Sequence, residues 1–289
     1  MTSLRERIDP LIAERSPWLF RNTPWARVAK PLLDKTLAYE RSLEIGATLD
    51  PLTAEQQMVR LADMLCKRLT HKGLGNVPAS GAALIVANHP TGIADGIMLQ
   101  RVLSTVRTDT YFFANADIMK VMPQYETVIA PVEWRIDKRS RAKTRETMNY
   151  TRQAVSEGRI GVIFPAGRLA KRKGLRLHER PWMASAAMIA RKFDLPIIPV
   201  NIRARNSSLF YLFDFLHPTL RDITLFYETL NKDRQPYHIE IGEPISASSL
   251  PKNSDEGIEI LKREVLALGQ PDYTLVSSKM RPASQLFGS

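Results

Sequence analysis

The chain has 289 residues, of which 44% are hydrophobic and 25% are charged, and these proportions exclude disordered and fibrous proteins. Forty-one Lys and Arg residues against 30 Asp and Glu give a net charge of +11, which predicts an anionic partner: nucleic acid, an anionic bilayer or a phosphorylated substrate. The single cysteine, Cys66, excludes a disulfide framework and favours a reducing compartment. The N-terminus lacks a signal-peptide pattern and no run of about 18 apolar residues occurs, so we expect no membrane span.

Most of the excess positive charge lies in two short windows. Residues 135–145 and residues 168–180 each contain six basic residues and one acidic residue, so each window carries +5. Together they account for +10 of the +11, and the rest of the chain is nearly neutral. This concentration predicts a binding site rather than a uniformly basic surface.

The first 45 residues place tryptophans among basic side chains at helical spacing. Trp18 and Trp25 alternate with leucines and with Arg21, Arg27 and Lys30. This pattern is typical of a helix that lies in a membrane interface, with its cations toward anionic lipid. An N-terminal helical arm packed on the core explains the same residues, and the two interpretations are compatible.

A helix is predicted next, and then a regular alternation of strands and helices. Asp50 and Pro51 open this helix, its apolar stripe runs to about Leu69, and Gly73 and Gly75 end it. The segments that follow are strands at 82–87, 110–114, 128–132, 160–164, 197–202 and 237–241, and helices at 93–106, 141–157 and 182–193.

This alternation predicts an α/β fold, with a mixed central sheet flanked by helices on both faces. We expect three parts: a helical N-terminal extension over residues 1–72 that includes the possible membrane-surface arm, an α/β domain over residues 73–270, and a C-terminal tail over residues 271–289.

His89 and Asp95 stand on either side of a predicted strand-to-helix turn shaped by Pro90 and Gly92. The carboxylate can approach one imidazole nitrogen, which fixes the tautomer and leaves the other nitrogen to accept a proton. The alternative is an Asp that only caps the helix beside an ordinary loop histidine. The position at a strand end favours the catalytic interpretation.

A second strand, 160–164, ends in the turn Phe164-Pro165-Ala166-Gly167 and is followed by cations. Backbone N–H groups of such a turn, together with Arg168, predict a cradle for phosphate or carboxylate. A solvated basic loop is the alternative, and the strand that delivers the turn to the sheet edge weighs against it.

Several blocks, in order, resemble the lysophospholipid/glycerol-phosphate acyltransferase superfamily. They are Asn88-His89-Pro90 with Asp95-Gly96, Phe164-Pro165-Ala166-Gly167, and Leu195-Pro196 with Pro199-Val200. The run Arg205-Asn206-Ser207-Ser208, with Leu216-His217-Pro218, resembles the hemolysin-like branch, which includes lyso-ornithine-lipid acyltransferases. The resemblance covers about residues 75–245.

The resemblance implies a glycerol-phosphate acyltransferase-like fold and an O-acyltransferase acting on a lysolipid such as 1-acylglycerol-3-phosphate or lyso-ornithine lipid. His89 would be the general base and Asp95 would orient it, with acyl-CoA or acyl-carrier protein as co-substrate. Five residues separate His89 from Asp95 where the superfamily usually has four. Ala166 and Arg168 replace the usual Glu and Thr, so the acceptor contacts of that block are not carried over.

The basic windows then gain roles in substrate binding. By position, Arg135 stands where the family's second block binds the acceptor headgroup, and Arg139 and Arg141 are further candidates. Arg168 with the backbone of Gly167 would hold the acceptor's phosphate or carboxylate, and either window would equally suit an acidic acyl-carrier protein. The candidate substrate-binding residues also include loop residues of both motifs: Asn88, Gly92 and Pro165.

Two other features of the sequence do not point to one function. The apolar run at 209–216 predicts a bilayer contact, an acyl pocket or a buried segment. The remaining histidines have no metal-ligand spacing, and we expect neither a metal nor a bound cofactor: His71, His178, His217 and His238.

We expect an enzyme that is cytoplasmic and peripheral on the inner face of the cell membrane, binding its anionic surface and no nucleic acid. Two alternatives stay open. A pI of about 9.8 is compatible with a nucleic-acid-binding protein, although the basic windows lack interleaved aromatic residues. Ala166 and the altered spacing are compatible with an inactive lipid-binding homologue.

Overall fold

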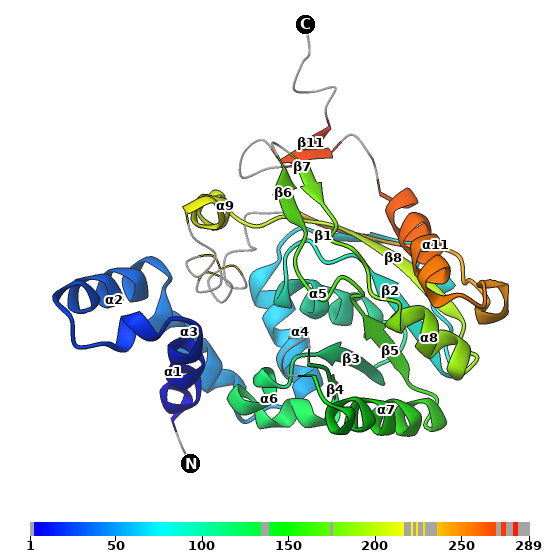
Figure 1. Ribbon diagram of the computed structural model, residues 1–289, viewed down its shortest axis with the longest axis horizontal. Coiled ribbons are helices and arrows are strands. Elements are labelled where there is room, and N and C mark those ends of the chain that lie inside the picture. Colours follow the sequence, from blue (N-terminus) through cyan, green and yellow to red (C-terminus); the bar gives the residue numbers. More distant parts are fainter. Residues whose placement is uncertain are drawn as a thin grey trace, which may run out of the picture.

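The structure is a computed structural model that describes residues 3–133, 139–173, 176–216, 221, 224, 228, 236–269, 273–275 and 280–282. A seven-stranded sheet lies at its centre in the order β1-β9-β8-β2-β5-β3-β4 (Figure 1). Its strands are β1 Leu69–Lys72, β2 Ala83–Ala87, β3 Thr110–Ala114, β4 Ile129–Pro131, β5 Ile160–Ile163, β8 Ile197–Arg203 and β9 Tyr237–Ile241. Neighbouring strands are parallel except β8 and β9, which are antiparallel.

Helices cover both faces of this sheet. Successive strand residues point to opposite sides, so each face carries apolar side chains that a helix layer buries. On one face, Ile85 and Ala87 of β2 join a core formed with α4 (Ala54–Leu65) and α5 (Ile93–Leu103). Leu84 and Val86 join a second core on the other face. The helices of that second core are α7 Arg141–Ser156, α8 Ser185–Lys192 and α11 Ser254–Ala267.

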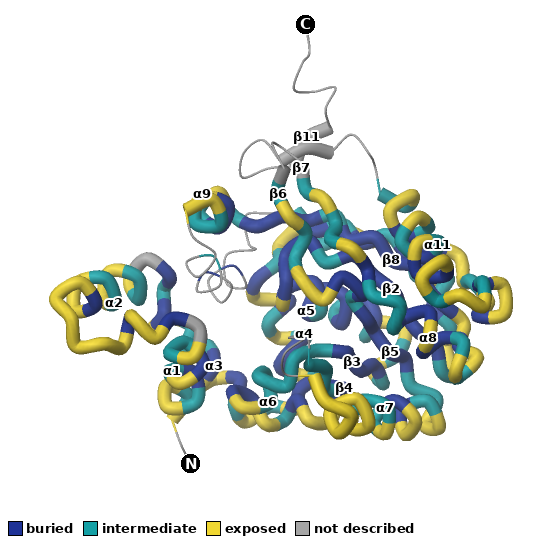
Figure 2. The backbone as a smooth tube through the Cα atoms, in the orientation of Figure 1, coloured by how far each residue is buried: buried dark blue, intermediate teal, exposed yellow. Residues whose placement is uncertain are grey.

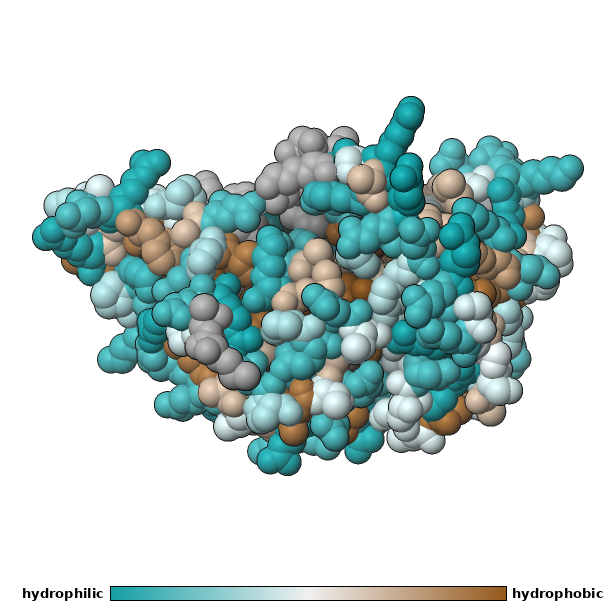
Figure 3. All heavy atoms as spheres, turned by 90° about the horizontal axis from the view of Figure 1, so that it is seen from below, coloured by the Kyte–Doolittle hydropathy of each residue, from teal (hydrophilic) through white to brown (hydrophobic). Residues whose placement is uncertain are grey.

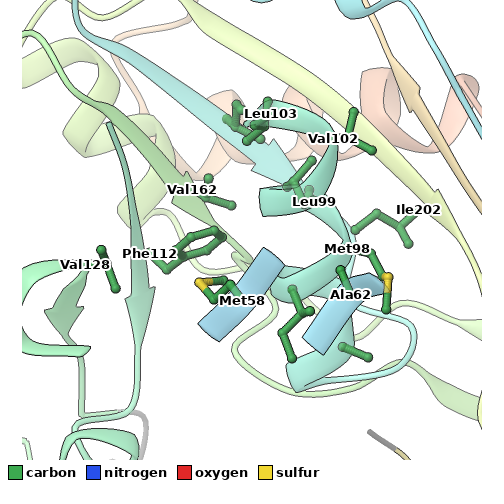
Figure 4. Close-up of a cluster of buried hydrophobic side chains, with 14 of the residues drawn as sticks. Met58, Ala62, Met98, Leu99, Val102, Leu103, Phe112, Val128, Val162 and Ile202 are labelled. Atoms are coloured by element: carbon green, nitrogen blue, oxygen red, sulfur yellow. The ribbon is translucent and has the colours of Figure 1, made fainter. Parts of the chain in front are cut away.

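The first core holds the helix that follows His89 in place (Figure 4). Ala62 of α4 lies beside Met98 of α5, and Met58 of α4 lies beside Phe112 of β3, and all four are buried. Burial of aliphatic side chains stabilises a fold by roughly 1.5–3 kcal/mol for each large side chain. The loop between β2 and α5 is therefore held between two rigid elements.

An N-terminal arm projects from one side of the sheet, as Figure 1 shows at its left. Its helices are α1 Leu4–Arg15, α2 Pro24–Thr36 and α3 Tyr39–Leu49, with a short 3-10 helix at Pro17–Phe20. Ser3 and Glu6 form a capping box that starts α1. Much of α2 is exposed, in contrast to the sheet (Figure 2).

The prediction of an α/β fold with a mixed sheet, flanking helices and N-terminal helices is confirmed. The predicted helix at 50–69 is wrong at both ends. It starts at Ala54 because Thr53 and Gln56 form a capping box, whereas Asp50 ends α3. Residues 69–72 form β1, which pairs with β9.

Smaller elements complete the structure. They are α6 Asp117–Val121, α9 Ser208–Leu216, the antiparallel pair β6 Lys171–Lys173 and β7 Arg176–His178, the antiparallel pair β10 Tyr273–Leu275 and β11 Met280–Pro282, and short 3-10 helices at Leu74–Asn76, Pro123–Thr127 and Ala247–Ser249. The sequence analysis did not anticipate the β6–β7 hairpin. The predicted tail, 271–289, contains β10 and β11, and its other residues lie outside the described part.

Candidate active site

The two predicted motifs meet at one edge of the sheet. β2 and β5 are parallel neighbours, so their carboxyl ends lie side by side, and these ends lead into His89 and Phe164. The His89 imidazole stacks on the Phe164 ring with centroids 4.4 Å apart and an interplanar angle of 24°. This edge is where ligands bind in open α/β sheets.

His89 and Asp95 form a close pair. Nδ1 of His89 lies 3.0 Å from Oδ2 of Asp95. The Asp95 side chain is fully buried, whereas 19% of the His89 side chain is exposed. The contact falls short of hydrogen-bond geometry at Nδ1, so the imidazole and the carboxylate lie side by side at short range. Nδ1 faces the carboxylate, and Nε2 is the nitrogen left for proton transfer.

Four donors from two distant segments hold the Asp95 carboxylate. Oδ2 accepts hydrogen bonds from the backbone N–H groups of Thr91, at 2.8 Å, and Gly92, at 2.9 Å. Oδ1 accepts from the Thr91 hydroxyl at 2.5 Å and from the Tyr237 phenol at 3.1 Å. Asp95 is thus placed in a fixed orientation beside the imidazole.

Tyr237 reaches this carboxylate from β9, 142 residues away in the chain. Its hydroxyl also contacts the Thr91 hydroxyl. Burial, and then the negative charge of Asp95, raise the pKa of Tyr237 well above its ordinary value. The phenol therefore keeps its proton and remains a donor.

Gly92 has a backbone that L side chains rarely adopt, with φ +101° and ψ −135°. This conformation turns its N–H toward Asp95 at the start of α5. Gly92, predicted to contact substrate, is engaged in shaping this turn.

Asn88 was also predicted to contact substrate, and its amide is engaged by the scaffold. Its Oδ1 accepts from the N–H of Ile202 at 2.6 Å, and its Nδ2 donates to the carbonyl of Ile202 at 3.0 Å. These bonds join the end of β2 to β8. Asn88 therefore fixes the place where the chain turns into His89.

The turn after β5 is built around Gly167, whose φ is +58°. Its N–H donates to the carbonyl of Phe164 at 2.9 Å, which closes the turn, so this N–H is not aimed at a ligand. Pro165 is buried and its carbonyl accepts from the N–H of Met183 at 3.0 Å. Arg168 is exposed just beyond the turn. Of the predicted cradle, the exposed cation is the part in a position to meet an anion.

The segment after this turn also holds the His89 backbone from both sides. The carbonyl of His89 accepts from the N–H of Ala170 at 3.0 Å, and the His89 N–H donates to Glu179 Oε1 at 3.2 Å. Glu179 Oε2 accepts from the Trp182 indole at 3.1 Å. Burial raises the pKa of Glu179, against the opposing effect of these two hydrogen bonds.

A family model described as Acyltransferase matches residues 68–203, which contain His89, Asp95 and both turns. Two lyso-glycine lipid O-acyltransferases, from Phocaeicola vulgatus and Bacteroides thetaiotaomicron, are 21% and 20% identical over 196 and 197 residues. Each alignment covers 66% of this chain, with 68% of the first relative and 71% of the second.

Over residues 68–203 this chain matches the Acyltransferase family, and its curated relatives support the lysophospholipid acyltransferase superfamily. It is similar in fold to the crystal structure of the 1-acyl-sn-glycerophosphate (LPA) acyltransferase PlsC from Thermotoga maritima, with a TM-score of 0.50 and 15% identity. That likeness covers 84% of this chain and 97% of that chain. The family assigned from the sequence blocks is therefore confirmed, and the protein is an acyltransferase.

In this acyltransferase the first basic window approaches the turn after β5 through Arg139. Its guanidinium lies 3.2 Å from the Met183 sulfur, and the backbone N–H of Met183 donates a hydrogen bond to the carbonyl of Pro165. Arg141 and Arg145 line a shallow hollow of about 420 Å³ beside it. Arg135 lies outside the described residues. The structure thus brings the second window, and one arginine of the first, to the side of the site.

Thr91, Glu179 and Tyr237 are site residues that the sequence analysis missed. A threonine two residues after the histidine was a usable signal, because hydroxyls commonly bond nearby carboxylates. The sequence held no comparable signal for Tyr237 and Glu179, because the contact of Tyr237 depends on strand pairing and that of Glu179 on the β6–β7 hairpin. Among the described residues, no cluster of three or more His, Cys, Asp or Glu side chains could hold a metal ion.

Proposed function

We propose that this protein transfers a fatty acyl group from an acyl thioester to the hydroxyl of a lysolipid, with His89 as general base. The observation that carries the proposal is the contact of His89 Nδ1 with the buried Asp95 carboxylate at 3.0 Å, at the ligand-binding edge of the sheet. Asp95 fixes the tautomer in which Nε2 accepts a proton.

The proposed reaction proceeds in two steps without an acyl-enzyme. Nε2 of His89 takes the proton of the acceptor hydroxyl while the oxygen attacks the thioester carbonyl, which forms a tetrahedral oxyanion. The oxyanion then collapses, the carbon–sulfur bond breaks, and the thiolate takes the proton back from the imidazolium. The products are an ester and a free thiol. Asp95 stabilises the imidazolium between the steps, and Thr91 and Tyr237 are positioning residues for Asp95.

The acceptor we propose is a lysolipid with an anionic headgroup, because cations surround the site. Arg168 is exposed beyond the turn after β5, and Arg139 contacts Met183, whose N–H donates to the Pro165 carbonyl in that turn. The named relatives are lyso-glycine lipid acyltransferases, and lyso-glycine lipid joins 1-acylglycerol-3-phosphate and lyso-ornithine lipid as a candidate acceptor. Acyl-CoA and acyl-carrier protein are the candidate donors, and we propose that no bound cofactor takes part.

We further propose that the enzyme is peripheral on the inner face of the cell membrane. Trp25, Val28 and Leu32 share one stripe of α2 and are exposed, with 83% of Trp25 accessible. Hydrophobic side chains gather on the arm at the left of Figure 3. With Arg27 and Lys35 on the same helix, this stripe suits insertion into an anionic interface. No helix in the described part of the chain is long and apolar enough to cross a membrane.

An assay of acyl transfer tests the proposal. Purified protein is incubated with labelled acyl-CoA or acyl-carrier protein and with each candidate lysolipid, and the diacyl product is separated by chromatography. We expect ester formation with at least one acceptor. Absence of product from every pair would refute the proposed activity and favour the inactive lipid-binding homologue. Salt-sensitive binding to DNA that is stronger than binding to anionic vesicles would favour the nucleic-acid-binding protein.

A further inference from the structure

α9 exposes an apolar stripe at the side of the catalytic edge. Phe215 is 78% exposed, Leu216 58% and Leu212 53%, and their spacing places them on one face of the helix. The opposite face is buried, where Phe210 and Tyr211 pack against Leu169 and Leu177 of the hairpin region. A helix that has already buried one apolar face and exposes another presents a contact surface.

The β6–β7 hairpin brings positive charge to the same helix, against the face that Phe210 and Tyr211 bury. It lies inside the window 168–180, which carries +5. The Arg172 guanidinium lies 6.0 Å from the centre of the Tyr211 ring, so the cationic hairpin and α9 are in contact. Exposed apolar side chains beside a basic cluster are the chemistry that recognises an anionic lipid surface.

This surface is joined to the candidate active site by the hairpin segment. Ala170 and Glu179, on either side of the hairpin, make the two hydrogen bonds that hold the His89 backbone. α9 stands on the same side of the sheet as the N-terminal arm, toward the left of Figure 1, whereas α8 and α11 lie at the right. A surface that contacts a bilayer here would bring the mouth of the site to the membrane.

We propose that the α9 stripe and the β6–β7 hairpin form a second bilayer contact, separate from the arm, at the rim of the active site. Leu212, Phe215 and Leu216 enter the interface, and the exposed Lys171 of β6 meets anionic headgroups. The acceptor then reaches His89 without leaving the lipid phase. This inference rests on the proposed function for its purpose, but the contact itself is measured without activity.

The test compares matched pairs of exposed apolar side chains. The double variant Leu212→Ser/Phe215→Ser removes the stripe, and Met188→Ser/Leu266→Ser removes two exposed side chains from α8 and α11. Binding to phosphatidylglycerol vesicles is measured by cosedimentation, with circular dichroism and melting temperature as controls of folding. We expect the α9 variant to bind about tenfold or more weakly than wild type, and the control pair to bind within about twofold.

A second variant tests the charge. We expect Lys171→Glu in β6 to weaken binding to phosphatidylglycerol vesicles at low salt by roughly fivefold, with little effect on neutral phosphatidylcholine vesicles. Unchanged vesicle binding by both variants would overturn the inference. Binding of both variants to acyl-carrier protein is measured in parallel. If the variants lose this binding and still bind vesicles as wild type does, the surface is a protein contact and the inference is overturned.

Activity separates this inference from the proposed function. We expect the α9 variant to lose transfer to a lysolipid embedded in vesicles and to retain transfer to a short-chain, water-soluble acceptor. A wild-type protein without any transfer would refute the proposed function, and vesicle binding would still decide the contact. Equal loss with both acceptors would overturn the inference and leave the function standing.

Discussion

The surroundings of Asp95 differ from the N-terminal arm and α9 in how far their side chains are buried. Asp95 is fully buried and accepts hydrogen bonds from three residues, two of them next to each other and the third on a distant strand. The arm and α9 instead expose Trp25 and Phe215 to solvent. In the proposed function, proton transfer relies on the buried, hydrogen-bonded carboxylate, whereas contact with lipid relies on exposed side chains.

The largest effect among the residues around His89 is expected from Asp95→Asn. An amide has one oxygen where the carboxylate has two, so it cannot accept both from the Thr91 and Gly92 N–H groups and from the Thr91 and Tyr237 hydroxyls, and the fixed orientation beside His89 is lost. We expect kcat to fall by about 10³-fold, measured by steady-state transfer kinetics. An unchanged kcat in a folded Asp95→Asn variant would show that this buried carboxylate takes no part.

Tyr237→Phe removes one donor from the same carboxylate and is expected to have a smaller effect. We expect kcat to fall roughly tenfold while KM stays within about twofold, because Tyr237 positions Asp95 without touching substrate. Tyr111→Phe is the matched control. Tyr111 is also a fully buried tyrosine of the sheet, and its hydroxyl has no hydrogen-bond partner among the described residues. Equal loss in both variants would indicate general destabilisation of the core.

A substitution in the periphery is expected to separate binding from chemistry. We expect Trp25→Ser to weaken binding to phosphatidylglycerol vesicles by about fivefold, because it removes the most exposed aromatic ring of α2. Turnover with a water-soluble acceptor is expected to stay within about twofold of wild type. A comparable loss of turnover in free solution would contradict the division between the two regions.

The smallest expected effect is the contribution of Glu179 to the pH dependence of the free energy of unfolding. Its pKa is raised in the folded protein, so protonation favours the folded state, and its contribution to stability is lost as pH rises from about 4.5 through the raised pKa. We expect the free energy of unfolding of wild type to fall more between pH 5 and pH 8 than that of Glu179→Gln, measured by urea denaturation. A steeper fall in the variant would contradict this assignment.

Much of the fold could be predicted because its signals are local. The strands at 110–114 and 237–241 match the structure, since each is a short apolar or alternating run. The start of α4 was missed because Thr53 and Gln56 form a stronger cap than Asp50. β1 was missed because Leu69–Lys72 is mostly exposed and is stabilised by pairing with β9, which local sequence does not reveal.

The candidate site divides in the same way. The approach of His89 to Asp95 could be predicted because both lie in one loop between a strand and a helix. The contribution of Tyr237 could not, because it depends on β9 lying antiparallel to β8, two strands from β2 in the sheet although far from it in the sequence. The use of the Gly167 N–H within its own turn, rather than for an anion, likewise follows from backbone geometry alone.

The most direct test of the central claim is the rate of acyl transfer by His89→Ala beside wild type, with the same thioester donor and the same lysolipid. We predict a loss of about 10³-fold or more in kcat, with the melting temperature near that of wild type, because the variant lacks the base that accepts the hydroxyl proton. Transfer by a folded His89→Ala variant at a rate close to that of wild type would contradict the proposed mechanism.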